Sequence, residues 1–98
     1  MHYVYILHAP AHDKFYVGQT PDLQTRLLFH NELSEHSYTS KYRPWVLMKS
    51  IEVADRSTAV KMERYIKGRK SRDYILKLIH DDQAVELLRK KFEAPLAG

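Results

Sequence analysis

The stretch from Lys14 to Asn31 reads KFYVGQTPDLQTRLLFHN and carries the strongest local signals in the chain. Its first part, Lys14 to Val17, is rich in aromatic and β-branched residues and predicts a strand that Gly18 ends. The segment His2 to Leu7, HYVYIL, has the same character. A turn over residues 9–13, which contains a proline, separates the two segments. We therefore expect an antiparallel hairpin at the start of the chain.

The second part of the stretch predicts a helix from about Pro21 to Asn31. Thr20 suits the N-cap, and Pro21 suits the first helical position because its missing N–H would have no partner there. Asp22 in the first turn complements the helix dipole. The following residues, 32–43, are polar without a steady period, so we expect a loop there.

A third strand is expected over Trp45 to Val53, WVLMKSIEV, directly after a proline. Its apolar residues recur at a spacing of two, which indicates a strand that is largely buried on one side. The expected buried face comprises Trp45, Leu47, Ile51 and Val53, with Val46 and Met48 on the opposite face.

Helices dominate the rest of the chain. Asp55 or Ser57 is expected to cap a second long helix that Gly68 ends. Ser71 is expected to cap a third helix with a stripe of Ile75, Leu78 and Ile79, and Asp81 or Asp82 a fourth that turns Val85, Leu88 and Phe92 inward. The predicted fold class is α+β: a small three-stranded antiparallel sheet in the order ββαβαα, flanked by helices. We expect one domain over residues 1–93 and a short flexible tail over residues 94–98.

Composition narrows the class of protein. The chain has 98 residues, 44% of them hydrophobic and 29% charged, which is typical of one globular domain. It has no cysteine, which excludes a disulfide scaffold and a zinc site built from cysteines. No apolar run approaches the ~20 residues of a membrane helix, and Met1 leads straight into HYVYIL without a signal-peptide pattern. We expect a cytoplasmic protein without a membrane partner.

The net charge of +4 and the pI of about 9.4 suit a polyanionic partner such as nucleic acid. The run Lys67 to Lys77, KGRKSRDYILK, is basic with an interleaved tyrosine. It would track a nucleic-acid backbone, or it would form the solvated faces of two helices. Charge alone does not decide between these alternatives, because many basic domains bind no nucleic acid.

Glu63 is the first polar residue that interrupts an apolar face. At about 100° per residue, Ala59, Met62 and Ile66 share its face of the second helix, and the glutamate falls inside that stripe. Burying an unpaired carboxylate is costly, so Glu63 needs a partner. The partner is either a nearby Lys or Arg in a salt bridge, or a hard divalent cation such as Mg²⁺.

Arg26 and His30 present the same problem on the first helix, where they lie one turn apart among leucines. Arg26 would pair with Glu63, cover apolar surface with its stem, or hold a phosphate with its fork of donors. His30 would be a hydrogen-bonded structural residue or part of a site.

Seven tyrosines are a rich supply for this length, and several lie in the predicted hairpin. Tyr3 and Tyr5 must point to one face because strand side chains alternate. Packing explains tyrosines in strands equally well. A catalytic role as general base would require a nearby cation, because a phenol with a pKa of ~10 is a poor base at neutral pH.

The segments YVYIL, FYVGQT and LQTRLLFHN, followed by a lone helical glutamate, resemble the GIY-YIG nuclease family. Tyr3-Val4-Tyr5 stands where the first signature stands, and Tyr16-Val17-Gly18 where the second stands. Tyr5 and Tyr16 are eleven residues apart and Arg26 follows Tyr16 by ten, as in the family. The resemblance covers about residues 2–79. The chain is similar to the small single-domain branch of the family, which is like the N-terminal domain of excinuclease C. The chain departs from the family at two places. Tyr3 replaces the first glycine, and Tyr74, Ile75 and Leu76 occupy the region where excinuclease-type members carry an asparagine beyond the glutamate.

The resemblance implies a metal-dependent DNA endonuclease that hydrolyses phosphodiester bonds, linked to DNA repair or recombination and acting on branched, flapped or damaged DNA. It implies one Mg²⁺ or Mn²⁺ ion on Glu63 and charge neutralisation by Arg26. It also implies water activation by Tyr5 or Tyr16, with assistance from His30. Gly18 would let the phosphate approach the backbone closely. The residues expected to contact nucleic acid are Gly18, Thr20, Lys67, Arg69 and Lys70.

Two other classes of function remain open at this point. A non-catalytic nucleic-acid-binding module would keep the fold and bind DNA or RNA without metal. A protein-interaction domain would use Arg26 and Glu63 only as a buried pair. The absence of an added DNA-binding domain in the sequence suggests that a protein partner supplies targeting.

Overall fold

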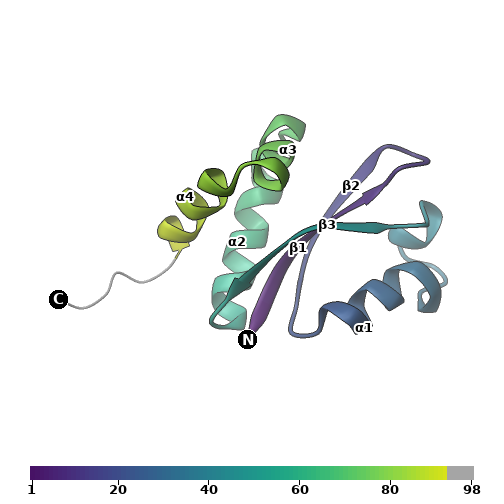
Figure 1. The fold of residues 1–98 in the computed structure, drawn as a ribbon. Coiled ribbons are helices and arrows are strands. Elements are labelled where there is room, and N and C mark those ends of the chain that lie inside the picture. Colours follow the sequence, from purple (N-terminus) through teal and green to yellow (C-terminus); the bar gives the residue numbers. More distant parts are fainter. Residues whose placement is uncertain (93–98) are drawn as a thin grey trace.

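The computed structural model describes residues 1–92, so the tail predicted at residues 94–98 lies outside the described residues. Three antiparallel strands form one sheet in the order β2-β1-β3, and helices lie on both of its faces, which confirms the predicted α+β fold (Figure 1). The strands are β1 (His2–Ala9), β2 (Lys14–Thr20) and β3 (Val46–Val53). The helices are α1 (Leu23–Leu28), α2 (Arg56–Arg69), α3 (Arg72–His80) and α4 (Asp82–Phe92), with a π-helical turn at Phe29–Leu33 and a 3-10 turn at Thr39–Lys41.

The hairpin of β1 and β2 is longer than the sequence predicts. Tyr5 lies opposite Gly18 in the register, and Tyr3 lies opposite Thr20. The prediction that Gly18 ends the second strand is therefore wrong, because β1 is long enough to pair with β2 up to Thr20. The turn between the strands places Asp13 at a φ of 50°, in the left-handed region that aspartate tolerates better than most residues.

Strand β3 contains a bulge that divides its apolar pattern. Ile6 lies opposite Lys49 but the next residue, Leu7, lies opposite Leu47, so Met48 is the extra residue. One extra residue reverses the side to which all preceding side chains point. Leu47 is therefore 38% exposed on the opposite face from the buried Ile51. The predicted continuous buried face is wrong for this reason.

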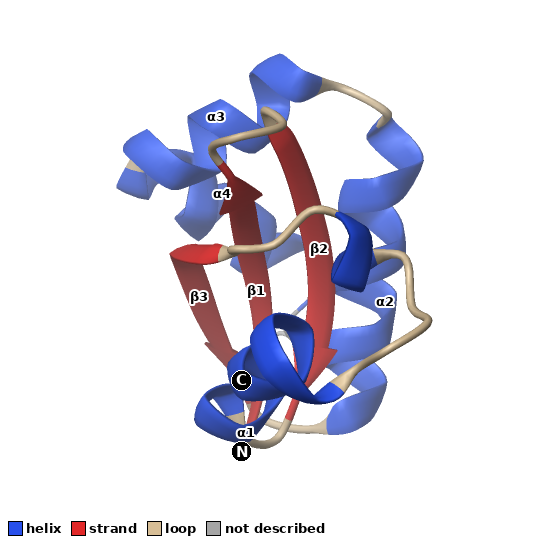
Figure 2. Ribbon diagram, turned by 90° about the vertical axis from the view of Figure 1, so that its right-hand side faces the viewer, coloured by secondary structure: helices blue, strands red, loops and turns tan. Residues whose placement is uncertain are grey.

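The sheet separates two hydrophobic cores, one under each layer of helices (Figures 1 and 2). The larger core lies between the sheet and the layer of α2, α3 and α4. It contains Val4, Ile6, Val17, Ile51, Val53, Ala59, Met62, Ile66, Leu78, Ala84, Val85 and Leu88, with Ile75, Ile79 and Phe92 packed against it. The smaller core lies under α1 and contains Tyr5, Leu7, Ala9 and Trp45, with Tyr16, Leu23, Leu27 and Tyr42 against it. The inward stripes predicted for α3 and α4 are confirmed.

Helix α1 starts later and ends earlier than predicted. Asp22, not Thr20, is its N-cap, because the Asp22 carboxylate accepts from the Thr25 backbone N–H at 3.2 Å. The Thr20 hydroxyl instead accepts from the Asp22 backbone N–H at 3.1 Å and closes the turn before the helix. After Leu28 the chain forms the π-helical turn. The predicted continuous helix is therefore a short α-helix followed by a π-helical turn.

The predicted caps of the other helices are mostly confirmed. Asp55 caps α2, Ser71 caps α3, and the Asp81 carboxylate accepts from the Gln83 backbone N–H at the start of α4. The end of α2 differs, because the helix continues through Gly68 and Lys70 adopts the left-handed conformation at a φ of 48°. Between residues 1 and 92, no helix has the length and apolar character that spanning a bilayer requires.

Candidate functional site

A buried tyrosine–histidine pair forms the centre of the candidate site. Tyr5 points from β1 into the core under α1, and His30 reaches the same core from the π-helical turn. Each residue is only 2% exposed. The Tyr5 hydroxyl lies 2.9 Å from His30 Nε2, within hydrogen-bond distance.

Burial keeps both members of this pair uncharged at neutral pH. Burial, together with the nearby positive charges of Arg26 and Arg43, lowers the pKa of His30 to about 4. Burial raises the pKa of Tyr5 to about 12; the Arg26 guanidinium opposes that rise, while Tyr16 and Glu63 add to it. Among the protein's own groups, burial therefore outweighs Arg26 in setting the pKa of the Tyr5 phenol.

The other nitrogen of His30 leads into a chain of hydroxyl groups. His30 Nδ1 lies 2.8 Å from Thr39 Oγ1, which lies 3.0 Å from Ser37 Oγ. Ser34 donates to the same Ser37 oxygen at 2.6 Å. A neutral imidazole has one donor and one acceptor nitrogen, so Tyr5 and Thr39 must take opposite roles toward it. Sequence reasoning missed this chain, because the polar segment at residues 32–43 carried no periodic signal.

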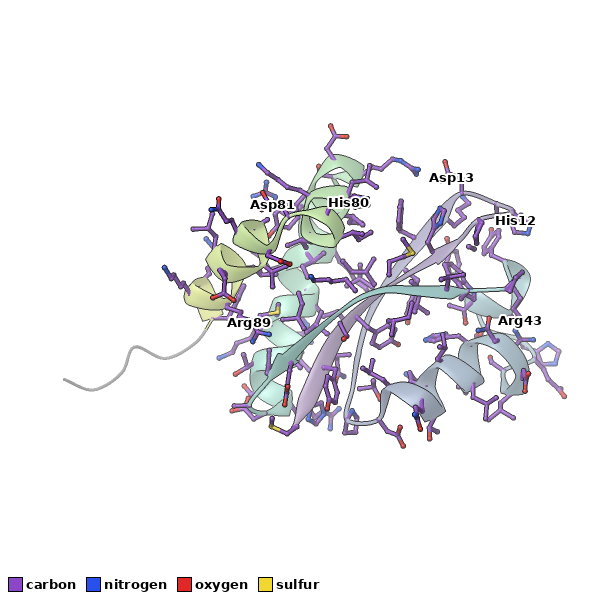
Figure 3. The ribbon with its side chains drawn as sticks, in the orientation of Figure 1. His12, Asp13, Arg43, His80, Asp81 and Arg89 are labelled. Atoms are coloured by element: carbon purple, nitrogen blue, oxygen red, sulfur yellow. The ribbon has the colours of Figure 1, made fainter. Side chains whose placement is uncertain are left out.

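Arg43 and Asn31 fix the backbone that presents His30. Arg43 Nε donates to the His30 carbonyl at 2.6 Å, and its Nη2 donates to the carbonyls of Phe29 and Ser34. Asn31 donates to the Trp45 carbonyl at 3.0 Å and accepts from the Trp45 N–H at 2.7 Å. Figure 3 shows Arg43 beside the turn that follows α1. Sequence reasoning also missed these contacts, which join residues nine to fourteen positions apart.

Tyr16 links this pair to helix α2. It lies on β2, half-buried, with its ring centroid 4.8 Å from that of His30 and 6.3 Å from that of Tyr5. Helix α2 runs alongside β2 at the edge of the sheet (Figure 2). Lys67 from α2 places its Nζ 5.3 Å from the Tyr16 ring centroid. The edge strand is therefore where the two layers of the molecule meet around the tyrosines.

Glu63 lies one turn before Lys67 on α2. Its carboxylate accepts from Lys67 Nζ at 2.7 Å, and its side chain is 20% exposed. Ala59, Met62 and Ile66 on the same helix are buried. Glu63 thus lies at the edge of the apolar stripe rather than inside it, and the salt bridge considered from the sequence is present with Lys67 as partner.

Arg26 is the most accessible of the five predicted catalytic residues. Its side chain is exposed, and its guanidinium lies 4.9 Å from the Phe29 ring centroid. It is also close enough to Tyr5 and His30 to influence the pKa of both. Contacts therefore link all five residues. Tyr5, Tyr16 and His30 are joined by ring contacts, and Glu63 reaches Tyr16 through Lys67. Arg26 lies over the Phe29 ring, whose centroid is 5.6 Å from that of His30.

The structure shows why position 18 is a glycine, which the sequence alone did not indicate. A Cβ atom at this position would lie 2.4 Å from the Tyr5 hydroxyl oxygen and 2.5 Å from its Cζ. The Tyr5 ring therefore lies in the space that any other side chain at position 18 would need. The glycine is required for the position of Tyr5, whether or not a phosphate also approaches its backbone.

The other residues expected to contact nucleic acid fall into different places. Lys67 and Lys70 line a cavity of about 300 Å³ together with Tyr16 and Arg72. Arg69 instead lines a separate cavity among α2, α3 and α4. Thr20 is only 6% exposed and its hydroxyl bonds to Asp22, so it offers little to a ligand at the surface.

A family model for the GIY-YIG catalytic domain matches residues 1–75, which include all five predicted catalytic residues. The chain belongs to the GIY-YIG family, which is a family of nucleases. It is 32% identical over 91 residues to a UPF0213 protein of Lactococcus lactis subsp. cremoris (strain SK11), covering 93% of this chain and 88% of that protein. It is 31% identical over 91 residues to the UPF0213 protein YsiG of Lactococcus lactis subsp. lactis (strain IL1403), covering 93% and 83%. No solved structure gives a significant match.

Proposed function

We propose that this chain is a divalent-metal-dependent DNA endonuclease that hydrolyses phosphodiester bonds. The observation that carries the proposal is the cluster of Tyr5, Tyr16 and His30. The Glu63–Lys67 pair lies beside Tyr16, and Arg26 lies over the Phe29 ring next to His30. Membership of a nuclease family supports the proposal. The proposed substrates are branched, flapped or damaged DNA of repair or recombination in the cytoplasm, with a protein partner that supplies targeting.

The proposed roles follow from burial and charge. Phosphodiester hydrolysis needs an activated water, neutralisation of charge on the phosphate and support for the leaving oxygen. Arg26 is exposed, so its guanidinium is accessible to a phosphate, whose charge it would neutralise. Tyr16 is more accessible than Tyr5 and is our candidate to orient and deprotonate the water. Tyr5 keeps its proton and holds His30 in place through the hydrogen bond.

Glu63 would hold one Mg²⁺ or Mn²⁺ ion. Within residues 1–92 no group of three His, Cys, Asp or Glu side chains gathers to form a protein-built metal cage. A single partly exposed carboxylate still fits Mg²⁺, which keeps several waters and is commonly bound by one or two carboxylates together with substrate phosphates. When bound, the ion supplies Lewis-acid polarisation of the phosphate and stabilises the leaving oxygen.

The test is incubation of the purified protein with labelled single-stranded, duplex, flapped and four-way DNA, with Mg²⁺ or Mn²⁺ and with EDTA. We expect metal-dependent cleavage of at least one of these substrates. Arg26→Ala should lower the rate by about 10²–10³-fold, the scale of losing one transition-state donor. Glu63→Gln should abolish cleavage while DNA binding remains.

Arg64→Ala is the matched control, because it removes an exposed guanidinium next to Glu63 in the sequence of α2. It should leave the rate within about twofold, as is usual for surface substitutions. Cleavage that survives both Arg26→Ala and Glu63→Gln would contradict the assigned roles.

A non-catalytic nucleic-acid-binding module is the second candidate. The observation that favours it is the ion pair of Glu63 with Lys67, which places an ammonium group on the carboxylate proposed for the metal. This candidate predicts salt-dependent binding that is insensitive to metal and to Glu63→Gln. The absence of cleavage across the whole substrate panel, with binding retained, would support it.

A further inference from the structure

A second and larger cavity lies in the helical layer, among α2, α3 and α4. Its volume is about 790 Å³, compared with about 300 Å³ for the cavity beside Tyr16. Asp81, which lines it, marks the junction of α3 and α4 in Figure 3, at the opposite end of the molecule from Arg43. The reaction proposed above uses none of the residues that line this cavity.

The charged residues that line this helical cavity carry an excess of positive charge. Four basic side chains line it, those of Arg69, Lys77, Lys90 and Lys91, against the two carboxylates of Asp73 and Asp81. All four basic residues are exposed. The excess of positive charge suits an anionic ligand with several charges along its length.

Two aromatic rings stand among these cations. The ring centroids of Tyr65 and Tyr74 are 6.3 Å apart at an interplanar angle of 83°. The Arg69 guanidinium lies 4.4 Å from the Tyr74 centroid, and Lys91 Nζ lies 5.1 Å from the Tyr65 centroid. Aromatic rings beside cations characterise surfaces that bind single-stranded nucleic acid, because bases stack on the rings and phosphates meet the charges. An acidic peptide would use the charges but not the rings.

The helical cavity adjoins the smaller cavity beside Tyr16, which is the one proposed catalytic residue in the lining of that smaller cavity. Ser71, the N-cap of α3, lines both of them. Lys67, Lys70 and Arg72 lie on the side of Tyr16, and Arg69 lies on the other side. Basic side chains thus continue around the turn between α2 and α3, from Tyr16 to the pair of tyrosines.

We propose that the helical cavity binds a single-stranded segment of nucleic acid that flanks the site of cleavage, with bases on Tyr65 and Tyr74 and phosphates on the surrounding cations. This inference rests on the proposed function for the position of the flanking strand. The binding itself is independent of cleavage. Base faces are open only where a strand is unpaired, so flapped or branched DNA fits better than intact duplex.

The test measures binding of a labelled oligothymidylate by fluorescence anisotropy, with EDTA and in the Glu63→Gln background, as a function of salt. The double variant Arg69→Gln/Lys77→Gln should lower the slope of log K against log salt by about 1.4, since each phosphate contact on a single strand contributes about 0.7. Tyr74→Leu should weaken binding about tenfold, and Tyr74→Phe should retain it.

Lys61→Gln/Arg64→Gln is the matched control, because it removes the same charge from exposed positions of α2 that line neither cavity. It should leave the slope unchanged. Thermal melts of every variant separate lost binding from lost folding, and the Arg69 and Lys77 changes are at exposed positions that folding tolerates.

The outcomes separate this inference from the proposed function. Binding that depends on Arg69, Lys77 and Tyr74, in a protein that cuts no substrate, would support nucleic-acid binding in the helical cavity. The same result would contradict the proposed nuclease activity. Cleavage with binding that is insensitive to all three residues would overturn the cavity. Equal affinity for duplex and single strand would overturn the assignment to single strands. Binding of a polyglutamate peptide without binding of oligothymidylate would assign the cavity to an acidic protein partner instead.

Discussion

Gly18 shows how one missing side chain positions the candidate site. The Tyr5 ring lies where a Cβ atom at position 18 would be, so the strand register that pairs these two residues also packs them against each other. His30 then closes over the Tyr5 hydroxyl. The position of the buried pair therefore depends on a residue that has no side chain.

Gly18→Ala should destabilise the protein by about 1–3 kcal/mol, the usual cost of overpacking a filled core. The reason is the distance of 2.4 Å between the new Cβ and the Tyr5 hydroxyl oxygen, which forces the ring or the strand to move. Urea unfolding measures this loss. Gly68→Ala is the control, because that position has no atom within 4 Å of its Cβ and lies in α2, where alanine should stabilise by about 0.5–1 kcal/mol. Equal effects of the two changes would contradict the packing argument.

His30 should make stability depend on pH in mildly acidic solution. Its pKa is about 4 in the folded protein and ~6.5 in an unfolded chain, so the unfolded state takes up a proton first as the pH falls. The contribution of His30 is fully present above pH ~6.5 and is lost as the pH falls to about 4. Its size is on the order of 3 kcal/mol.

Urea unfolding at several pH values, for the wild type and for His30→Gln, isolates this contribution. The wild type should lose stability steeply between pH ~6.5 and 4, and the variant should have a shallower slope. Titration of the His30 ring by NMR gives the pKa directly. Identical slopes in both proteins, or a ring that titrates near 6.5, would show that His30 is not held neutral by burial.

At the scale of elements, the π-helical turn after α1 is what presents His30. Instead of continuing as a regular helix past Leu28, the chain forms a wider π-helical turn over Phe29–Leu33. Arg43 donates to three carbonyls, two in this turn and one in the residue that follows it. Arg43 thereby replaces hydrogen bonds that a continuing helix would have made. Its charge also contributes to the low pKa of His30.

Arg43→Gln should therefore have two effects. Losing charged hydrogen bonds to these carbonyls should cost about 1.5–3 kcal/mol in unfolding experiments. Losing the positive charge should raise the pKa of His30, which NMR titration measures. Arg43→Lys keeps the charge but not the fork of donors, so it should lose stability with a smaller change in the His30 pKa. Arg64→Gln, at an exposed position of α2, should change neither the stability nor the pKa of His30. If Arg43→Gln also leaves both unchanged, Arg43 does not position His30.

At the scale of the whole molecule, local patterns in the sequence predicted most of the elements. Alternation in HYVYIL and FYV predicted the hairpin, and Asp55 and Ser71 predicted the starts of α2 and α3. These features succeed because a strand face or an N-cap depends on residues within a few positions of each other. The spacing of Tyr5, Tyr16 and Arg26 also sufficed to point to the family.

The features that were mispredicted or missed depend on partners far along the chain. The bulge at Met48 follows from pairing with β1. The contacts of Arg43 and Thr39 with His30 join a loop without periodicity to the π-helical turn after α1. Gly68 was expected to end α2 because glycine is the preferred left-handed residue at helix ends. In the structure Lys70 takes that left-handed conformation instead. A sequence pattern carries no signal for such contacts, because they arise only when the layers pack.

The two layers of the molecule contribute different charges to the candidate site, and these charges would set the affinity of the proposed metal site. The layer of α1 supplies Arg26, whereas α2 supplies both Glu63 and the Lys67 ammonium 2.7 Å from its carboxylate. A divalent cation at Glu63 would compete with that ammonium for the carboxylate. We therefore expect weak binding of Mn²⁺ by the protein alone.

Lys67→Gln should strengthen Mn²⁺ binding about two- to fivefold, because a partly exposed helical ion pair contributes about 0.3–1 kcal/mol. Electron paramagnetic resonance of free Mn²⁺ in a titration measures the affinity. Lys61→Gln removes the same charge from another exposed position of α2 and should leave the affinity nearly unchanged, because screening weakens distant surface charges. Glu63→Gln should abolish the binding that Lys67→Gln strengthens. If the Lys67 and Lys61 variants bind Mn²⁺ equally, net charge rather than the Glu63–Lys67 pair governs affinity, and Glu63 loses its support as the ligand.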